Sequence, residues 1–252
     1  MAVRGVVRIA LLADIHANRQ AFSACLAHAR DNGAEQFALL GDYVGYGADP
    51  DWTVTEVMDL VSRGAAAVLG NHDCAVGDSS VELNLAARIV IEWTRGELGH
   101  EQRRFLAALP LTLERQGRLF VHAEASRPAS WTYVTGADDA KRSMRATSAD
   151  VTFCGHVHRP ALYTLSPAGR MTAFTPTAGV SVQLLPGRQW LAVLGSVGQP
   201  RDHSAAASYA MLDAAAATLT YHRVPYDVEQ AAARIRQQGL PAWLADRLYL
   251  GR

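Results

Sequence analysis

The chain has 252 residues, 49% of them hydrophobic, and its 24 Lys and Arg balance 24 Asp and Glu. This composition can build a sizeable buried core and excludes an intrinsically disordered chain. A net charge of zero offers no field that would attract an extended nucleic acid or hold the chain on a membrane surface.

The N-terminal region and the cysteines indicate the compartment. Residues 6–13 form an apolar stretch that is too short to span a bilayer and that ends at Asp14 rather than at a small-residue cleavage site. The three cysteines have no disulfide-framework spacing; they are Cys25, Cys74 and Cys154. We therefore expect a cytoplasmic protein without a signal peptide or membrane anchor.

Strands and helices alternate in the first third of the chain. The strand at 6–13 precedes a helix at 18–30, a second strand at 37–40 precedes a helix at 54–61, and a third strand covers 65–69. This alternation predicts a layered α/β sheet, whose ligands bind at the loops that leave the carboxyl ends of the strands.

The remainder of the chain begins with a mainly helical stretch at 83–109 and then changes to short strands. These strands are expected at 119–122, 151–154, 161–165, 171–174, 181–184, 190–194, 209–212 and 218–222, and helices at 227–237 and 241–250. No repeat, linker or charge block marks a boundary. Residues 1–252 are therefore expected to form a single domain with two packed sheets flanked by helices.

Short polar clusters follow the predicted strands and contain five of the nine histidines. The clusters are Asp14-Ile15-His16, Gly41-Asp42, Gly70-Asn71-His72-Asp73, Val121-His122 and Gly155-His156-Val157-His158. Oxygen and imidazole ligands without thiolate suit manganese, iron or zinc. Because one ion cannot use so many donors, the clusters favour two divalent ions bridged by a carboxylate and roughly 3.5–4 Å apart.

The spacing within the clusters has a physical interpretation. Alternation at the end of a strand would direct Asp14 and His16 to the same side, and likewise His156 and His158. Adjacent glycines would let the backbone turn sharply; they are Gly41, Gly70 and Gly155.

Taken in order, the motifs D-x-H, G-D-x4-G, G-N-H-D and G-H-x-H resemble those of the calcineurin-like metallophosphoesterase superfamily. Residues 14–18, 45–50 and 195–202 are similar to its small bacterial phosphodiesterase-type branch, so the resemblance extends over nearly the whole chain. It implies a four-layer α-β-β-α sandwich of two mixed sheets, with a metal site at the loops after the strands.

The resemblance also implies a ligand set. One ion would be held by Asp14, His16 and His158, the other by Asn71, His122 and His156, and Asp42 would bridge them. A hydroxide between the ions would attack phosphorus in line.

Two neighbouring residues receive catalytic roles from the same resemblance. His72 would face the substrate, either as a proton donor to the leaving oxygen or as a stabiliser of phosphoryl charge. Asp73 would orient the His72 ring. Ala17 and Ala123 stand where the family often has Gly, which would narrow the site without removing a ligand.

Several other polar residues have more than one interpretation. Glu124 could reach a metal, a substrate hydroxyl or only solvent. Arg201, with His203 nearby, could pair with phosphate or form a local ion pair in a surface turn. Tyr43 and Tyr46 could stack on a base or an aryl ester, or cap the core.

The leading hypothesis is a metal-dependent phosphoesterase that hydrolyses a small phosphodiester or nucleotide-like substrate. A phosphomonoesterase, a dinucleoside polyphosphate hydrolase and a protein phosphatase would use the same centre. A non-catalytic, metal-stabilised binding scaffold is the alternative of another class, and the presence of every ligand type and of His72 favours an enzyme. The sequence makes no prediction of the oligomeric state.

Overall fold

The computed structural model describes residues 7–252 and contains two mixed sheets. From edge to edge, the first sheet consists of β3 (Ala66–Ala67), β2 (Gln36–Leu39), β1 (Arg8–Leu12), β11 (Ala207–Asp213), β12 (Thr218–Val224) and β9 (Ser181–Gln183). β1, β2 and β3 are parallel, whereas β11 is antiparallel to β1 and β12.

The second sheet has the same number of strands and is also mixed. Its order is β4 (Thr112–Arg115), β5 (Arg118–Val121), β6 (Val151–Cys154), β10 (Gln189–Val193), β7 (Ala161–Leu165) and β8 (Met171–Phe174). β5, β6 and β10 are parallel, and β4, β7 and β8 pair antiparallel to their neighbours.

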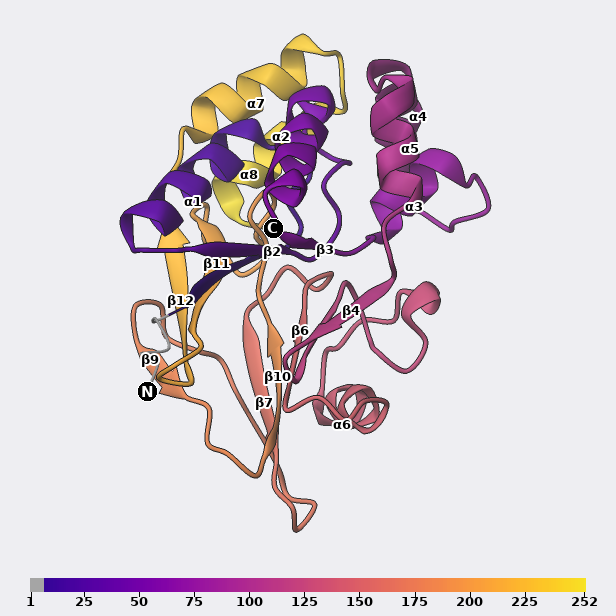
Figure 1. The fold of residues 1–252 in the computed structure, drawn as a ribbon. Helices are drawn as coiled ribbons and strands as arrows, with labels where there is room; N and C mark the ends of the chain where they lie inside the picture. The colour runs from indigo at the N-terminus through magenta and orange to yellow at the C-terminus, as the bar shows by residue number, and fades with distance from the viewer. Residues whose placement is uncertain (1–6) are drawn as a thin grey trace.

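Helices cover the outer faces of both sheets (Figure 1). On the side of the first sheet lie α1 (Arg19–Asp31), α2 (Pro50–Ser62), α3 (Asn71–Gly77), α4 (Leu85–Glu97), α5 (His100–Ala107), α7 (Val228–Gln237) and α8 (Ala242–Leu250). The helix α6 (Ala137–Arg145) packs on β7, β8 and β10 of the second sheet. The expected four-layer α-β-β-α sandwich of two mixed sheets is confirmed.

The layers are held together by separate apolar cores. Leu11 of the first sheet and Phe120 and Phe153 of the second lie in the cluster between the sheets. Phe22 of α1 and Val57 of α2 are fully buried in the cluster on the outer face of the first sheet. Burial of these side chains fixes the two sheets against each other, and hence the relative positions of the loops at their edges.

Several elements differ from the sequence-based expectation. β1 is shorter than the strand at 6–13, whose first residue lies outside the described residues, and β3 has two residues where a strand at 65–69 was expected. The mainly helical stretch expected at 83–109 consists of two helices separated at Gly99, which is extended (φ −68°, ψ 168°) and whose N–H donates to the Gln102 side chain. α3 and α6 were not expected.

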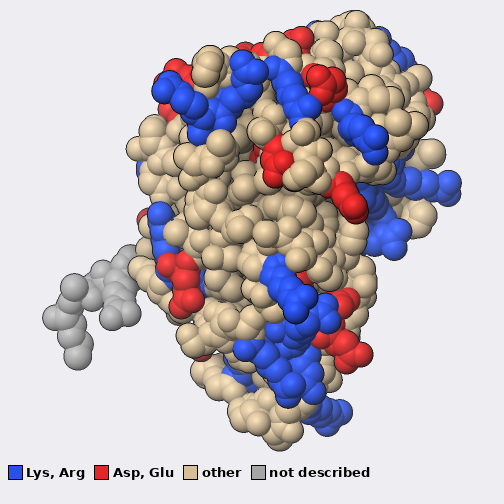
Figure 2. Space-filling view, turned by 90° about the vertical axis from the view of Figure 1, so that its right-hand side faces the viewer, with Lys and Arg blue, Asp and Glu red and all other residues tan. Residues whose placement is uncertain are grey.

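The surface of this fold carries charges of both signs. Figure 2 shows Lys and Arg beside Asp and Glu, with one contiguous group of positive side chains in the lower half of the view and further ones along the top and at the right. α6 carries Lys141 and Arg142 together with Asp138 and Asp139. Among residues 7–252, no helix has the length and apolar character needed to cross a bilayer.

Candidate metal centre

The structure brings the seven expected metal ligands together at one edge of the two sheets. They lie in the loops or helix start that follow β1, β2, β3, β5 and β6, and all are at most 7% exposed. Potential ligand atoms lie within 4.8 Å of one another in three overlapping groups, which are Asp14, His16 and His158; His16, Asp42 and His72; and Asp42, His122 and His156. The Asn71 Oδ1 lies 3.2 Å from His122 Nε2.

The backbone aims these side chains by left-handed turns rather than by strand alternation. β1 ends at Leu12 and β6 at Cys154, so the expected alternation cannot orient the D-x-H and H-x-H pairs. Instead, five of the candidate ligands have positive φ, namely Asp14 (55°), His16 (50°), Asp42 (55°), His156 (68°) and His158 (63°). Such conformations cost roughly 1–3 kcal/mol each and cluster at functional sites.

Close backbone contacts explain two of the glycines. A Cβ at Gly155 would collide with the Asp14 carboxylate, and a Cβ at Gly70 would collide with Asp42. The absence of a side chain at Gly155 and Gly70 therefore lets the backbone approach Asp14 and Asp42 closely.

Backbone carbonyl groups hold all four histidine ligands. The Nδ1 atoms of three rings face carbonyl oxygens: His16 faces Val44 O at 3.1 Å, His122 faces Leu40 O at 2.7 Å and His158 faces Gln199 O at 2.6 Å. The Nε2 of His156 lies 2.8 Å from Trp131 O. Because a carbonyl oxygen only accepts, each of these ring nitrogens carries the hydrogen and donates it.

The opposite ring nitrogens consequently face one another in two couples. His16 Nε2 lies 3.0 Å from His158 Nε2, and His122 Nε2 lies 3.1 Å from His156 Nδ1. Once both rings of a couple are neutral, their lone pairs repel at this distance, and a cation shared between them converts the repulsion into coordination. His122, whose pKa is raised by Asp42, gives up its second proton when a metal ion binds. The donor set therefore fits divalent metal ions.

Burial controls the charge of three of the imidazoles. Burial lowers the pKa of His16 and of His158 well below the usual range. Repulsion from His158 lowers the pKa of His16 further, and repulsion from Arg201 lowers the pKa of His158 further. Burial and the charge of His122 lower the pKa of His156 to about 3. These rings are neutral at pH 7, as metal ligands must be.

Asp42 and His122 form a tightly coupled pair. Burial acts against both charges, but the attraction between them prevails: the pKa of Asp42 lies well below its usual range and that of His122 is raised to about 9. Asp42 Oδ2 is 3.3 Å from His122 Nε2. Burial raises the pKa of Asp14, the second buried carboxylate of the cluster.

Asp73 does not orient the His72 ring, which corrects the expected role. Its carboxylate accepts hydrogen bonds from the backbone N–H groups of Asp42 (2.7 Å), Tyr43 (2.8 Å), Val44 (3.2 Å) and Gly70 (3.1 Å). Burial and the charge of Asp42 raise its pKa to about 7. Asp73 therefore holds the loop after β2 against the start of α3.

His72 is buried at the edge of the cluster. Its Nε2 lies 3.9 Å from Asp42 Oδ2, and its Nδ1 has no hydrogen-bond partner among residues 7–252. The ring packs against Tyr46, with centroids 4.6 Å apart. Burial lowers the pKa of His72, partly offset by the charge of Asp42.

The structure decides two of the open interpretations. The Glu124 carboxylate accepts from the N–H and hydroxyl of Ser126 and lies 3.8 Å from Arg142 Nε, so it stabilises a turn rather than facing the ligands. The Tyr43 hydroxyl donates in the core to the carbonyl oxygens of Leu39 and Val68, where it cannot contact a ligand.

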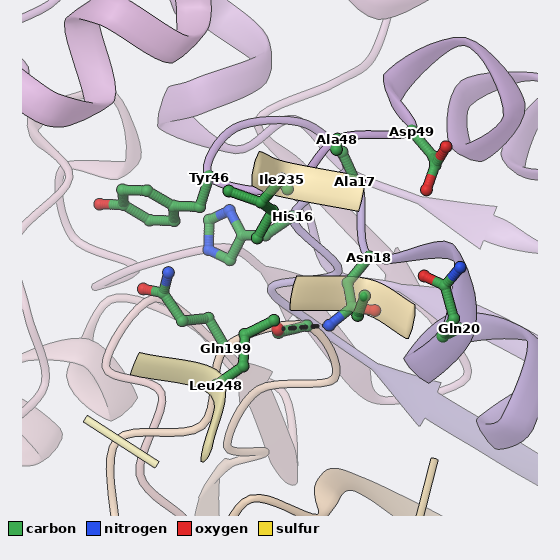
Figure 3. Close-up of a pocket in the computed structure, with 13 residues that line it drawn as sticks. His16, Ala17, Asn18, Gln20, Tyr46, Ala48, Asp49, Gln199, Ile235 and Leu248 are labelled. Carbon is green, nitrogen blue, oxygen red and sulfur yellow. Dashed lines mark hydrogen bonds between the residues drawn. The ribbon is translucent and has the colours of Figure 1, made fainter. Parts of the chain in front are cut away.

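Residues 196–199, to which the sequence analysis gave no role at the site, hold two of the candidate ligands in place. After β10, the Ser196 hydroxyl and the Gly198 N–H donate to Asp14 O at 2.8 and 2.9 Å, and Gln199 O accepts from His158. Figure 3 shows the same region beside His16, where the Asn18 amide donates to Gly198 O at 2.9 Å. In the sequence, this segment stood out through the similarity of residues 195–202 to the small bacterial phosphodiesterase-type branch. That similarity did not indicate that the segment holds Asp14 and His158.

Comparisons with known proteins agree with this geometry. The family model of the calcineurin-like phosphoesterase superfamily domain matches residues 7–217. Uncharacterized protein MJ0912 of Methanocaldococcus jannaschii is 35% identical over 252 residues, covering 97% of this chain and 98% of that protein. The crystal structure of a metallophosphoesterase from Sphaerobacter thermophilus has a TM-score of 0.86 at 32% identity, covering 98% of this chain and 100% of that one.

A more distant structure shares the fold. The crystal structure of hypothetical protein PH1004 from Pyrococcus horikoshii OT3 has a TM-score of 0.73 at 21% identity, and the match covers 98% of this chain and 99% of that one. With a family model that matches most of the chain and a relative of 35% identity along nearly all of it, the chain belongs to the calcineurin-like phosphoesterase superfamily.

Proposed function

We propose that this protein is a metal-dependent phosphoesterase that hydrolyses a small phosphodiester or nucleotide-like substrate at a two-metal centre. The observation that carries the proposal is the pair of facing imidazole couples, His16 with His158 and His122 with His156, whose opposing ring nitrogens lie 3.0 and 3.1 Å apart. Each couple has a buried carboxylate beside it, since Asp14 lies 3.4 Å from His158 and Asp42 lies 3.3 Å from His122.

The arrangement suggests a division of the ligands between two ions. Asp14, His16 and His158 would hold one ion. Asn71, His122 and His156 would hold the other, with Asp42 as the shared ligand. When bound, divalent ions polarise the phosphoryl group and make water more acidic.

The protein groups contribute orientation and proton control. Backbone carbonyl groups keep the protonated nitrogen of each imidazole turned away from the centre, which presents the bare nitrogen to a cation. We propose that His72, which lies beside the cluster without being held by a carbonyl group, donates a proton to the leaving oxygen.

Hydrolysis assays with a panel of substrates test this function. The protein would be assayed with a nitrophenyl diester, the corresponding monoester, nucleotides and a dinucleoside polyphosphate, each with Mn²⁺, Fe²⁺ or Zn²⁺. We expect metal-dependent hydrolysis with the highest kcat/KM for a diester, and loss of turnover after chelation. Full activity after exhaustive chelation would contradict metal dependence, and a tenfold preference for monoesters or polyphosphates would contradict the substrate class.

A further inference from the structure

Arg201 is fixed to the loop that carries a candidate ligand. Its backbone N–H donates to His158 O at 3.1 Å, and the preceding segment accepts the hydrogen bond from His158 Nδ1 through Gln199 O. The position of Arg201 is therefore tied to the position of His158 through two backbone contacts.

The Arg201 side chain lies over a ring that borders the centre. Its guanidinium carbon is 5.6 Å from the centroid of the Tyr46 ring, and the same ring lies 4.7 Å from His16 and 4.6 Å from His72. A cation over an aromatic face is held by the ring quadrupole, so Tyr46 positions the guanidinium beside the candidate ligands.

This guanidinium has no anionic partner in the described part of the chain. The adjacent carboxylate of Asp202 pairs with Arg223 instead, which removes the local ion pair considered from the sequence. Arg201 Nη2 donates to Gln199 Oε1 at 3.1 Å, but its Nε is buried and has no hydrogen-bond partner within residues 7–252. A buried donor left unpaired is costly, which indicates that an acceptor belongs there when the site is used.

We propose that Arg201 binds a non-bridging oxygen of the phosphoryl group at the centre. A planar guanidinium with several donors matches phosphate oxygens and forms charge-assisted hydrogen bonds, whereas a neutral ligand would leave its charge unpaired. This inference rests on the proposed phosphoesterase function and adds the residue that recognises the substrate's charge. Because the contact is with the reacting group, every phosphoester substrate should depend on it.

The test measures binding of inorganic phosphate to the Mn²⁺-loaded protein by calorimetry, together with metal content, melting and steady-state hydrolysis. The variants are Arg201→Gln, Arg201→Lys and the control Arg19→Gln. Arg19 is a matched control because its guanidinium also lies over an aromatic ring, 5.0 Å from the centroid of Trp52, but outside the cluster.

We expect Arg201→Gln to keep its metals and fold while its Kd for phosphate rises roughly 10–100-fold, the usual size of a lost hydrogen-bonded charge contact. Arg201→Lys should recover part of this affinity, since lysine keeps the charge without the planar fork. Arg19→Gln should bind phosphate as the wild type does, and kcat/KM should fall in Arg201→Gln for monoesters and diesters alike.

Other outcomes overturn the inference in distinguishable ways. Phosphate binding by Arg201→Gln within twofold of the wild type, or an equal loss in Arg19→Gln, would refute the role of Arg201 while leaving the phosphoesterase function intact. A loss confined to substrates with a second phosphate would move the contact to a distal group and refute the proposal as stated. A wild-type protein that binds metal but neither phosphate nor phosphoesters would refute the proposed function and, with it, this inference.

Discussion

The carboxylate of Asp42 faces more imidazoles than any other group described in the centre. Its Oδ2 lies 3.3 Å from His122, 3.8 Å from His16 and 3.9 Å from His72. Asp42→Asn would remove the shared negative charge and leave two cations to repel each other across a short gap. We expect loss of at least one ion by elemental analysis, with a corresponding loss of turnover.

The control for this substitution is Asp31→Asn, which changes an exposed carboxylate at the end of α1. It should keep both ions and the wild-type rate. An Asp42→Asn protein with unchanged metal content and rate would refute the assignment of Asp42 as the shared ligand.

His72 gives a second prediction at the level of single side chains. Among residues 7–252, no backbone carbonyl group holds the His72 ring as carbonyl groups hold the four histidine ligands. His72→Asn should therefore keep both ions and lower kcat by roughly 10²–10⁴-fold. Comparing an alkyl ester with a nitrophenyl ester separates the two possible roles. A proton donor matters mainly for the alkyl ester, whereas a stabiliser of phosphoryl charge matters for both. Loss of the metals, or full activity on both esters, would contradict a catalytic role.

The sequence identified the candidate ligands because they occur in compact motifs directly after strands. It could not identify the bonding of Asp73, since adjacency to His72 suggested a contact that the turn into α3 directs elsewhere. Arg201 was ambiguous for a similar reason. Whether Arg201 pairs with Asp202 depends on Arg223, which lies in β12. The sequence does not reveal that Arg223 is close to Asp202 in the fold.

At the level of elements, Asp73 connects the loop after β2 to the first turn of α3 through four backbone donors. Asp73→Ala would leave these buried donors without an acceptor, which should destabilise the protein by about 1–3 kcal/mol or more. Chemical denaturation would measure the change. Metal affinity should fall as well, because the same loop carries Asp42.

The matched control is Asp78→Ala at the end of the same helix, where the exposed carboxylate accepts hydrogen bonds from the N–H and hydroxyl of Ser80. This substitution should cost about 0.5 kcal/mol or less. Equal losses from the two substitutions would contradict a special role for the Asp73 network.

Sequence patterns predicted poorly the elements that are very short and the boundaries that depend on local capping. α3 has only seven residues, too few for a periodic pattern to emerge. The apolar pattern continues from α4 into α5, so only the conformation of Gly99 and its bond to Gln102 divides them. By contrast, β6 and β7 occur where expected, because buried runs with turn residues at each end define them well. The exposed strand β8 also occurs where expected, between turn residues.

At the level of the whole molecule, the candidate ligands connect the two sheets. Asp14, His16 and Asp42 follow strands of the first sheet, whereas His122, His156 and His158 follow strands of the second. Ions held between these loops would be bound by the folded chain alone, since unfolding separates the loops. Metal should therefore stabilise the fold by mass action, by about 2.7 kcal/mol per site at a free ion concentration one hundred times its Kd.

Thermal melting with and without Mn²⁺ measures this linkage. For a chain of this size, such a stabilisation raises Tm by about 5–11 °C, and chelation should reverse the rise. Asp42→Asn, which removes the shared ligand, should show a clearly smaller shift, whereas Asp31→Asn should respond as the wild type does. If Tm stays constant as Mn²⁺ is added, the loops of the two sheets do not bind ions jointly. If Asp42→Asn shows the full shift, the stabilising ions bind elsewhere on the chain.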